Sequence, residues 1–155
     1  IAERVNNNVR TMGVALTSCI PPAKGDPIFD ISDDEMEVGV GIHGEPGRER
    51  TKIKPADEIV QLLFDAVAGD LPFSSGDRVA VMVNGLGGTP PAELYVLYNK
   101  ASKLCEDRGL TIARNYVGEY CTAIEMAGCS LTLLKLDGEL EKLLDAPATT
   151  ACRIF

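Results

Sequence analysis

The chain of 155 residues is poor in histidine, in aromatic side chains and in positive charge. It has one histidine and no tryptophan, and aromatic residues make up 5% of it. One imidazole cannot build a multi-histidine zinc centre or a metalloprotease helix, so both kinds of site are excluded. Because 23 acidic residues outnumber 15 Lys and Arg residues, the net charge of −8 argues against a nucleic-acid-binding protein, which needs a basic face.

Long apolar runs are also missing from the sequence. No run approaches the roughly 18 residues that cross a bilayer, which predicts a soluble, cytoplasmic protein without a membrane partner. The chain begins at Ile1, with neither a start methionine nor a signal peptide, so we expect a piece of something longer. A hydrophobic content of 45% nevertheless predicts one folded domain with a substantial core.

The cysteines do not indicate a metal site or a disulfide framework. Their number is odd and no C-x-x-C pair occurs among Cys19, Cys105, Cys121, Cys129 and Cys152. A chain of this length can form a core without covalent cross-links, so we expect small, half-buried free thiols in a reducing cytoplasm.

Strand-like and helix-like apolar patterns alternate along the chain. Strands are expected over 13–18, 37–42, 77–84, 110–117 and 129–136. Helices are expected from Pro55, from Pro90 with Thr89 as its cap and Gly109 as its C-cap, over 122–127 and over 139–144. This order predicts an α/β fold, with a mixed sheet of about five strands covered by helices mainly on one face, in two layers.

Two of the helices are long enough to cover a sheet. Their apolar residues recur at helical spacing, in one case at Ile59, Leu62, Leu63, Ala66 and Val67 and in the other at Leu94, Leu97, Tyr98, Ala101 and Leu104. The domain organisation that we expect is the end of a helix from a missing upstream subdomain over 1–12, the α/β unit over 13–145, and a tail or linker over 146–155.

A glycine-rich loop, Gly85–Gly88, follows an expected strand and precedes an expected helix. Backbone amides at such a place can bind phosphate. The match to a dinucleotide-binding motif is partial because Pro90 stands where the third glycine belongs, and no Gly-Lys-Ser/Thr follows. The alternatives are a tight turn where strand and helix pack closely and a loop that lines a pocket.

His43 lies between an apolar strand and a turn rich in glycine and proline, in the sequence G-I-H-G-E-P-G. Functional groups of α/β proteins commonly lie at such strand ends, and the nearby glycines allow a second molecule to approach the ring. Imidazole is partly unprotonated near neutral pH and can act as a base or a nucleophile. Glu45 could orient the ring, but no serine or cysteine is tied to His43 by spacing, so a hydrolytic triad has no local support.

An acidic run contains Asp33, Asp34, Glu35 and Glu37. It is dense enough for a cation site but lacks the glycine and the spacing of a calcium-binding loop. We therefore expect a solvated acidic edge.

Five ordered segments resemble the dihydroxyacetone kinase family, in its dihydroxyacetone-binding (Dak1-type) subunit or domain. They are M-G-V-A-L at 12–16, G-V-G-I-H-G-E-P-G at 39–47, V-N-G-L-G-G-T at 83–89, V-G-E-Y at 117–120 and M-A-G-C-S-L-T-L-L at 126–134. The resemblance extends over nearly the whole chain. It corresponds to the second, C-terminal, of the two α/β subdomains of that unit.

The resemblance implies that His43 bonds covalently to the carbonyl carbon of dihydroxyacetone as a hemiaminal, with Glu45 in a supporting role. Glycerol has no carbonyl group and would be rejected. A hydroxyl of the held triose would then be phosphorylated to dihydroxyacetone phosphate. The phosphoryl donor, ATP with magnesium or a phosphotransferase relay, would belong to a separate domain or subunit.

The same resemblance implies that this chain itself binds no cofactor or metal, and that Gly85–Gly88 is part of the architecture, a pocket or a partner surface. It suggests a homodimer, and a fragment that is inactive alone. One alternative is a non-catalytic relative that binds dihydroxyacetone as a regulatory coactivator. Another is a ligand-binding domain with a glycine-rich loop and no covalent chemistry.

Overall fold

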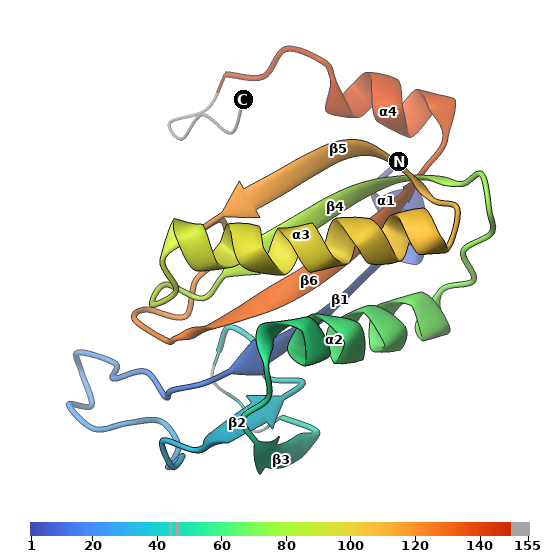
Figure 1. Cartoon of the computed structure of the whole chain (residues 1–155). Coiled ribbons are helices and arrows are strands. Elements are labelled where there is room, and N and C mark those ends of the chain that lie inside the picture. Colours follow the sequence, from blue (N-terminus) through green and yellow to red (C-terminus); the bar gives the residue numbers. More distant parts are fainter. Residues whose placement is uncertain (44, 46, 150–155) are drawn as a thin grey trace.

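A computed structural model describes residues 1–43, 45 and 47–149. In these residues six strands form one sheet in the order β3-β2-β1-β6-β4-β5 (Figure 1). The strands are β1 Val9–Ala15, β2 Glu35–Val38, β3 Glu49–Lys52, β4 Arg78–Gly85, β5 Thr111–Gly118 and β6 Gly128–Leu136. The pair β4–β5 is parallel and the other neighbouring pairs are antiparallel, so the expected mixed sheet is confirmed.

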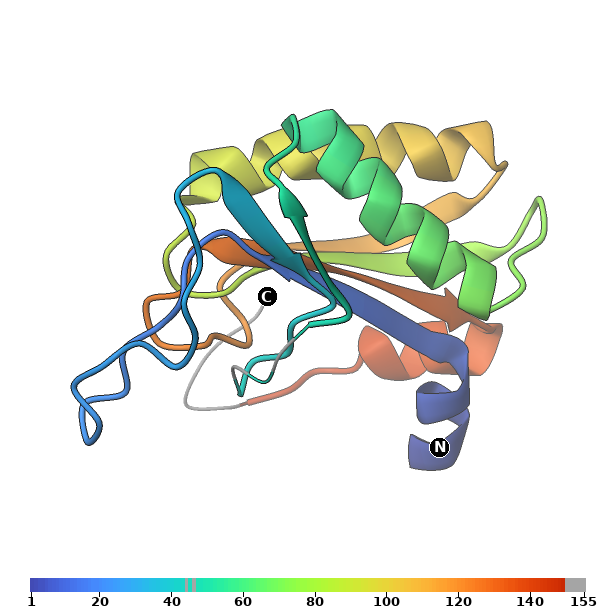
Figure 2. The same cartoon turned by 90° about the horizontal axis from the view of Figure 1, so that it is seen from below.

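The two long helices, α2 (Ala56–Asp70) and α3 (Pro91–Asp107), cover one face of the sheet (Figure 2). The short helices α1 (Ala2–Asn8) and α4 (Gly138–Leu144) lie on the other side. The expected two-layer arrangement, with helices mainly on one face, is therefore confirmed. In the part of the chain that the structure describes, no helix has the length and apolar character to cross a bilayer.

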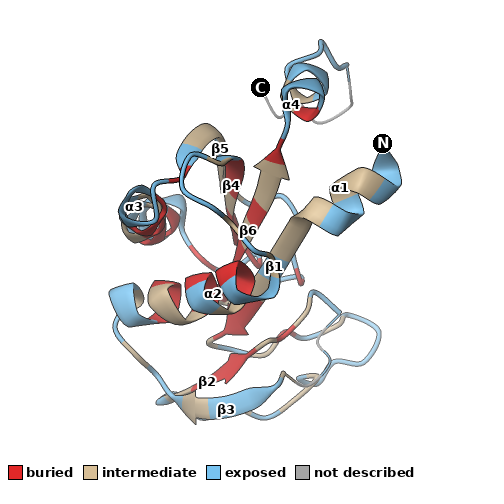
Figure 3. Cartoon of the chain, turned by 90° about the vertical axis from the view of Figure 1, so that its right-hand side faces the viewer, coloured by how far each residue is buried: buried red, intermediate tan, exposed pale blue. Residues whose placement is uncertain are grey.

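The main core lies between the sheet and the pair α2 and α3 (Figure 3). Alternate strand residues point to it, such as Val79, Val81 and Val83 of β4, because successive side chains of a strand face opposite sides of a sheet. The intervening residues of β4 therefore face the side that carries α1 and α4. This second face contains the functional site described below.

The ends of α3 follow one sequence expectation and contradict another. Gly109 adopts a φ of +70°, and its N–H donates to the carbonyl oxygen of Glu106 at 2.8 Å, as expected for a glycine that ends a helix. Thr89 does not cap the helix. Its Oγ1 donates to the carbonyl oxygen of Gly128 at 2.7 Å and accepts from the Gly128 N–H at 2.9 Å, so it ties the start of α3 to β6.

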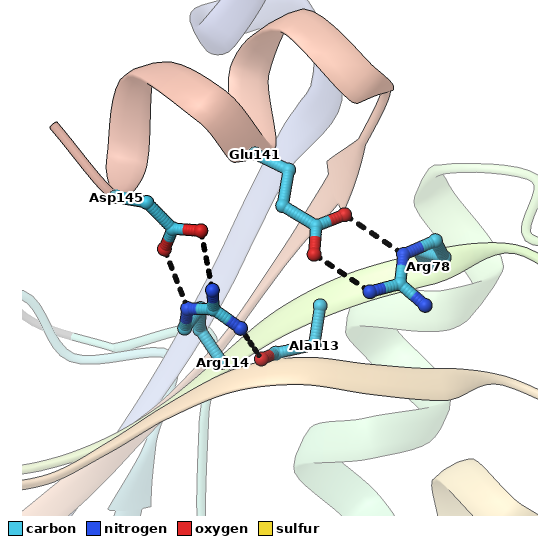
Figure 4. A network of polar contacts seen from close by, with 5 residues as sticks. All are labelled: Arg78, Ala113, Arg114, Glu141 and Asp145. Carbon is cyan, nitrogen blue, oxygen red and sulfur yellow. Dashed lines mark hydrogen bonds and ion pairs between the residues drawn. The ribbon is translucent and has the colours of Figure 1, made fainter.

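Helix α4 is fixed to the second face by a small apolar cluster and two arginines (Figure 4). Leu140 is buried against the sheet. Arg78 of β4 donates from two nitrogens to the carboxylate of Glu141, at 2.8 and 2.6 Å, and Arg114 of β5 pairs in the same way with Asp145. Two parallel hydrogen bonds fix the direction of an arginine–carboxylate pair as well as its length. The two bidentate pairs therefore set the orientation of α4 on the sheet.

Three expectations about secondary structure are wrong in detail, and one strand was missed. The expected helical end over 1–12 stops at Asn8, since β1 begins at Val9 and pairs with β6 over its whole length. The strand expected over 37–42 runs from Glu35 to Val38 and ends before Gly39, which has a φ of +82°. Strand β3 was not expected. The helix expected over 122–127 is a loop, held to the glycine-rich loop by a bridge between Met126 and Gly87.

Candidate functional site

His43 lies in the loop that joins β2 to β3, residues 39–48, here called the histidine loop. Its side chain is exposed and lines a cavity of about 540 Å³ on the second face of the sheet. Gly44 and Pro46, which also belong to the predicted turn, lie outside the described residues. The structure therefore places the candidate nucleophile at the wall of a cavity large enough for a small metabolite.

The floor of this cavity is a strip of the sheet in which most side chains are polar. It consists of side chains from the three central strands, Thr11, Met82, Asn84, Ser130 and Thr132. Thr132 donates from Oγ1 to Oγ1 of Thr11 at 2.9 Å. These residues face away from the main core, because their strand neighbours are the ones that contact α2 and α3.

These floor residues were not predicted from the sequence. A signal was present in the segment C-S-L-T-L-L at 129–134, where small polar residues alternate with apolar ones. Such alternation is typical of a strand with one polar face. The sequence alone did not show which strands are neighbours, so the floor could not be assembled from it.

Asn84 holds the part of the cavity wall that carries Cys121. It is 2% exposed, and its Oδ1 accepts hydrogen bonds from the N–H groups of Tyr120 and Cys121, both at 2.8 Å. Its Nδ2 donates to the carbonyl oxygen of Cys121 at 2.8 Å. A buried amide with these partners fixes the backbone of 120–121 to the sheet, which places Cys121 in the cavity lining.

Glu45 lines the same cavity as His43. Its carboxylate lies against the backbone of Gly41, where a Cβ atom would overlap Glu45 Oε1. The structure thus brings the two predicted site residues together in one cavity. Among the residues that the structure describes, no hydrogen bond joins the imidazole to this carboxylate, so the supporting role of Glu45 stays a prediction.

The amides of the glycine-rich loop are bonded within the chain. The Gly87 N–H donates to Oε2 of Glu119 at 2.8 Å, the Gly88 N–H to the carbonyl oxygen of Met126 at 2.9 Å, and the Leu86 N–H to that of Gly128 at 3.3 Å. The carboxylate of Glu119 stands where a phosphate oxygen would have to bind. The residues present therefore do not fit a nucleotide phosphate at this loop.

The acidic run splits into exposed and buried members. Asp33 and Asp34 are exposed, as expected of a solvated edge, but Glu37 is 6% exposed and faces inward. Glu37 accepts a hydrogen bond from Arg50 Nε at 2.8 Å, so the expectation of a solvated residue is wrong at this position. Across residues 1–43, 45 and 47–149, no three His, Cys, Asp or Glu side chains are arranged to hold a metal ion.

The cysteines in the described part are free thiols in two environments. Cys121 is exposed, whereas Cys19, Cys105 and Cys129 are buried. Cys152 lies outside the described residues. Burial raises the pKa of the Cys105 thiol to about 11 and that of Cys129 to about 12, so these two are almost entirely protonated near neutral pH.

Cys121 is expected to react with iodoacetamide at least about tenfold faster than Cys105 or Cys129, because an accessible thiolate is the reactive form. Mass spectrometry of peptides from the native protein, taken at successive times, measures each rate separately. Similar rates at Cys121 and Cys129 would contradict a structure in which Cys121 is exposed in the cavity wall and Cys129 is buried. Denatured protein, in which every site should react, is the control.

Comparison with known proteins gives one family and several close relatives. The model of the Dak1 domain matches residues 1–152. The dihydroxyacetone-binding subunit DhaK of the PEP-dependent dihydroxyacetone kinase of Escherichia coli is 42% identical over 174 residues, covering 97% of this chain and 49% of the relative. A DhaK subunit of a PTS-dependent kinase of Listeria innocua is 43% identical, covering 96% and 45%. The D-erythrulose kinase of Mycolicibacterium smegmatis is 45% identical, covering 97% and 26%.

Solved structures with the same fold include a kinase and a regulator. A dihydroxyacetone kinase operon co-activator, DhaQ, superposes with a TM-score of 0.87 at 30% identity, covering 94% of this chain and 46% of that one. The dihydroxyacetone kinase of C. freundii, in complex with AMP-PNP and Mg2+, gives 0.81 at 30% identity, covering 99% and 30%. The chain therefore spans half or less of the length of each of these proteins.

Proposed function

Because the chain belongs to the Dak1 domain family, we propose that it is the part of a dihydroxyacetone kinase that binds the triose, with His43 as the covalent anchor. The observation that carries the proposal is the position of His43, the single imidazole of the sequence, in the lining of a cavity whose floor carries hydroxyl groups. Glu45 supports His43 from the same loop in this proposal.

The proposed bond is a hemiaminal. A ring nitrogen of neutral His43 adds to the carbonyl carbon of dihydroxyacetone, so a C–N bond forms while the carbonyl π bond breaks. The nitrogen that adds carries no proton in the neutral ring, so the proton of the other ring nitrogen is lost while the carbonyl oxygen gains a proton, which leaves the overall charge unchanged. Glycerol has similar hydroxyl groups but no carbonyl carbon, so this chemistry selects the ketone.

The floor of the cavity suits the rest of the ligand. Thr11, Ser130 and Thr132 carry hydroxyl groups that can both donate and accept hydrogen bonds. A triose held at its central carbon would direct its two hydroxymethyl groups to such partners. Fixing one hydroxyl in place is the main contribution that a binding domain makes to phosphoryl transfer.

We place the phosphoryl donor outside this chain, on a separate domain or subunit. This is supported by the glycine-rich loop, whose amides are bonded to Glu119 and to backbone oxygens. Relatives named for PTS or PEP dependence and a kinase structure with AMP-PNP and Mg2+ correspond to two donor types, a phosphotransferase relay and ATP. Without the donor part, the chain alone should be inactive, and we propose a homodimer as its assembly.

Nuclear magnetic resonance tests the covalent bond directly. Full-length protein labelled with 15N-histidine and mixed with [2-13C]dihydroxyacetone should show a one-bond coupling between the labelled carbon and a ring nitrogen. Free ketone and its hydrate contain no such bond, and the variant His43→Ala should lose the coupling. Bound ligand without any coupling in the unmodified protein would overturn the covalent proposal.

A second candidate function is that of a regulatory coactivator that binds dihydroxyacetone without phosphorylating it. It is favoured by the TM-score of 0.87 with the operon co-activator. Formation of dihydroxyacetone phosphate when full-length protein is combined with a donor subunit and its phosphoryl source would decide for the kinase.

Parallel assays with D- and L-erythrulose test the ketose preference, since relatives include erythrulose kinases.

A further inference from the structure

The histidine loop is held at its start by backbone contacts. The Gly39 N–H donates to the carbonyl oxygen of Gly13 on β1 at 2.7 Å, where the positive φ of Gly39 turns the chain away from β2. At the other end, the Arg48 N–H donates to the carbonyl oxygen of Val38 at 2.7 Å. These two bonds fix the ends of the loop to β1 and to β2.

Glu37 adds a side-chain bond to the returning arm of the histidine loop. Its Oε1 accepts a hydrogen bond from the Gly47 N–H at 2.9 Å, and its Oε2 accepts one from Arg50 Nε at 2.8 Å. Arg50 is the cross-strand partner of Glu37 in the β2–β3 register, so one carboxylate joins β2, β3 and the returning arm of the loop. Gly47 lies so close to β2 that a Cβ atom there would overlap the carbonyl oxygen of Val38.

The burial of Glu37 indicates that its contacts with Gly47 and Arg50 are structurally important. A carboxylate that is 6% exposed needs hydrogen-bond partners, and here both of its oxygens have one. Glu35, two positions earlier on the same face of β2, is only half-buried and accepts from the Ser32 N–H at 3.3 Å, away from the histidine loop. The two glutamates therefore share strand, face and charge, but differ in their contact with the loop.

We infer that Glu37 is a positioning residue for His43, fixing the histidine loop so that the imidazole faces the cavity. This inference rests on the proposed function for the role of His43. Glu37 does not line the cavity and acts through Gly47 and Arg50. Its removal should weaken formation of the bond to the ketone without removing the cavity in which the ligand binds.

Glu37→Gln in the full-length protein tests this, with Glu35→Gln as the matched control. The glutamine can still accept from Gly47 but loses the charge that pairs with Arg50, so the fraction of bound [2-13C]dihydroxyacetone bonded to His43 should fall about tenfold at saturating ligand. Hydrogen exchange at 39–48 should become faster. The affinity for glycerol and the melting temperature should change little, and Glu35→Gln should match the unmodified protein in every readout.

Unchanged bonding and unchanged exchange in Glu37→Gln would overturn the inference. If Glu37→Gln fails to fold, Arg50→Gln removes the other end of the ion pair from a more exposed position and should give the same loss. If the unmodified protein shows no bond to His43, the proposed function fails. In that case hydrogen exchange at 39–48 still decides whether Glu37 holds the loop, so the two failures are distinguishable.

Discussion

Replacing His43 with alanine is expected to lower the affinity of the full-length protein for dihydroxyacetone about 100-fold, and to change its affinity for glycerol by about twofold or less. The difference arises because the hemiaminal bond needs a carbonyl carbon, which glycerol lacks. Both ligands would still use the hydroxyl groups on the cavity floor. Isothermal titration calorimetry with each ligand measures the two changes in the same preparation.

The variant His43→Gln separates bonding from shape. Glutamine is polar and of comparable reach, but its amide nitrogen is not a nucleophile, so the affinity for dihydroxyacetone should fall as far as in the alanine variant. Because His43 is exposed and lies in a loop, neither substitution should change the melting temperature by more than a degree or so. Equal losses for dihydroxyacetone and glycerol would mean that His43 shapes the cavity without bonding to the ligand.

The parts of the fold that could be predicted are those determined by local pattern. The apolar periodicity of the segment from Pro55 and the run D-R-V-A-V-M-V-N at 77–84 correspond closely to α2 and β4. Strand β3 could not be found in this way, because its four residues, E-R-T-K, are mostly exposed and show no alternation. It exists because β2 pairs with it and Glu37 meets Arg50 across the pair.

The loop at 122–127 is a case in which tertiary contacts outweigh local preference. Its composition is compatible with a short helix ended by Gly128, but Asn84 fixes the backbone just before it and the Gly88 N–H bonds to Met126 within it. Ile124 adopts a φ of +58°, which a β-branched residue rarely does in isolation. A sequence pattern contains none of these long-range contacts.

As with the fold, the parts of the site that depend on neighbouring residues in the sequence were predictable, and the parts that depend on long-range contacts were not. His43 could be identified because the residue and its Gly/Pro turn are adjacent in sequence. The cavity floor required the strand order, since Thr11 and Thr132 are separated by 121 positions. The occupancy of the glycine-rich loop by Glu119 required knowledge of a contact across 32 positions. The local motif therefore predicted the reactive group, His43, whereas the residues around it could be identified only from the structure.

Gly87→Ala is expected to lower the free energy of unfolding by about 3 kcal/mol or more, the largest stability effect that we predict for a single methyl group. Gly87 has a φ of +113°, a conformation that residues with a Cβ atom rarely adopt. A Cβ atom at this position would also overlap the carbonyl oxygen of Ile124. Because that oxygen belongs to the backbone, a change of side-chain rotamer cannot relieve the overlap.

Gly76→Ala separates these two causes. Gly76 also has a positive φ, +91°, but nothing lies within 4 Å of the position that its Cβ atom would occupy. The alanine there should cost only the conformational strain, about 1 kcal/mol, so urea denaturation of the two variants measures the steric cost at Gly87 by difference. Since Gly87 contacts the segment that carries Cys121, iodoacetamide labelling of Cys121 should change in Gly87→Ala and not in Gly76→Ala. Equal destabilisation by the two substitutions would mean that the 119–127 loop moves aside freely, and that it does not form a rigid wall of the cavity.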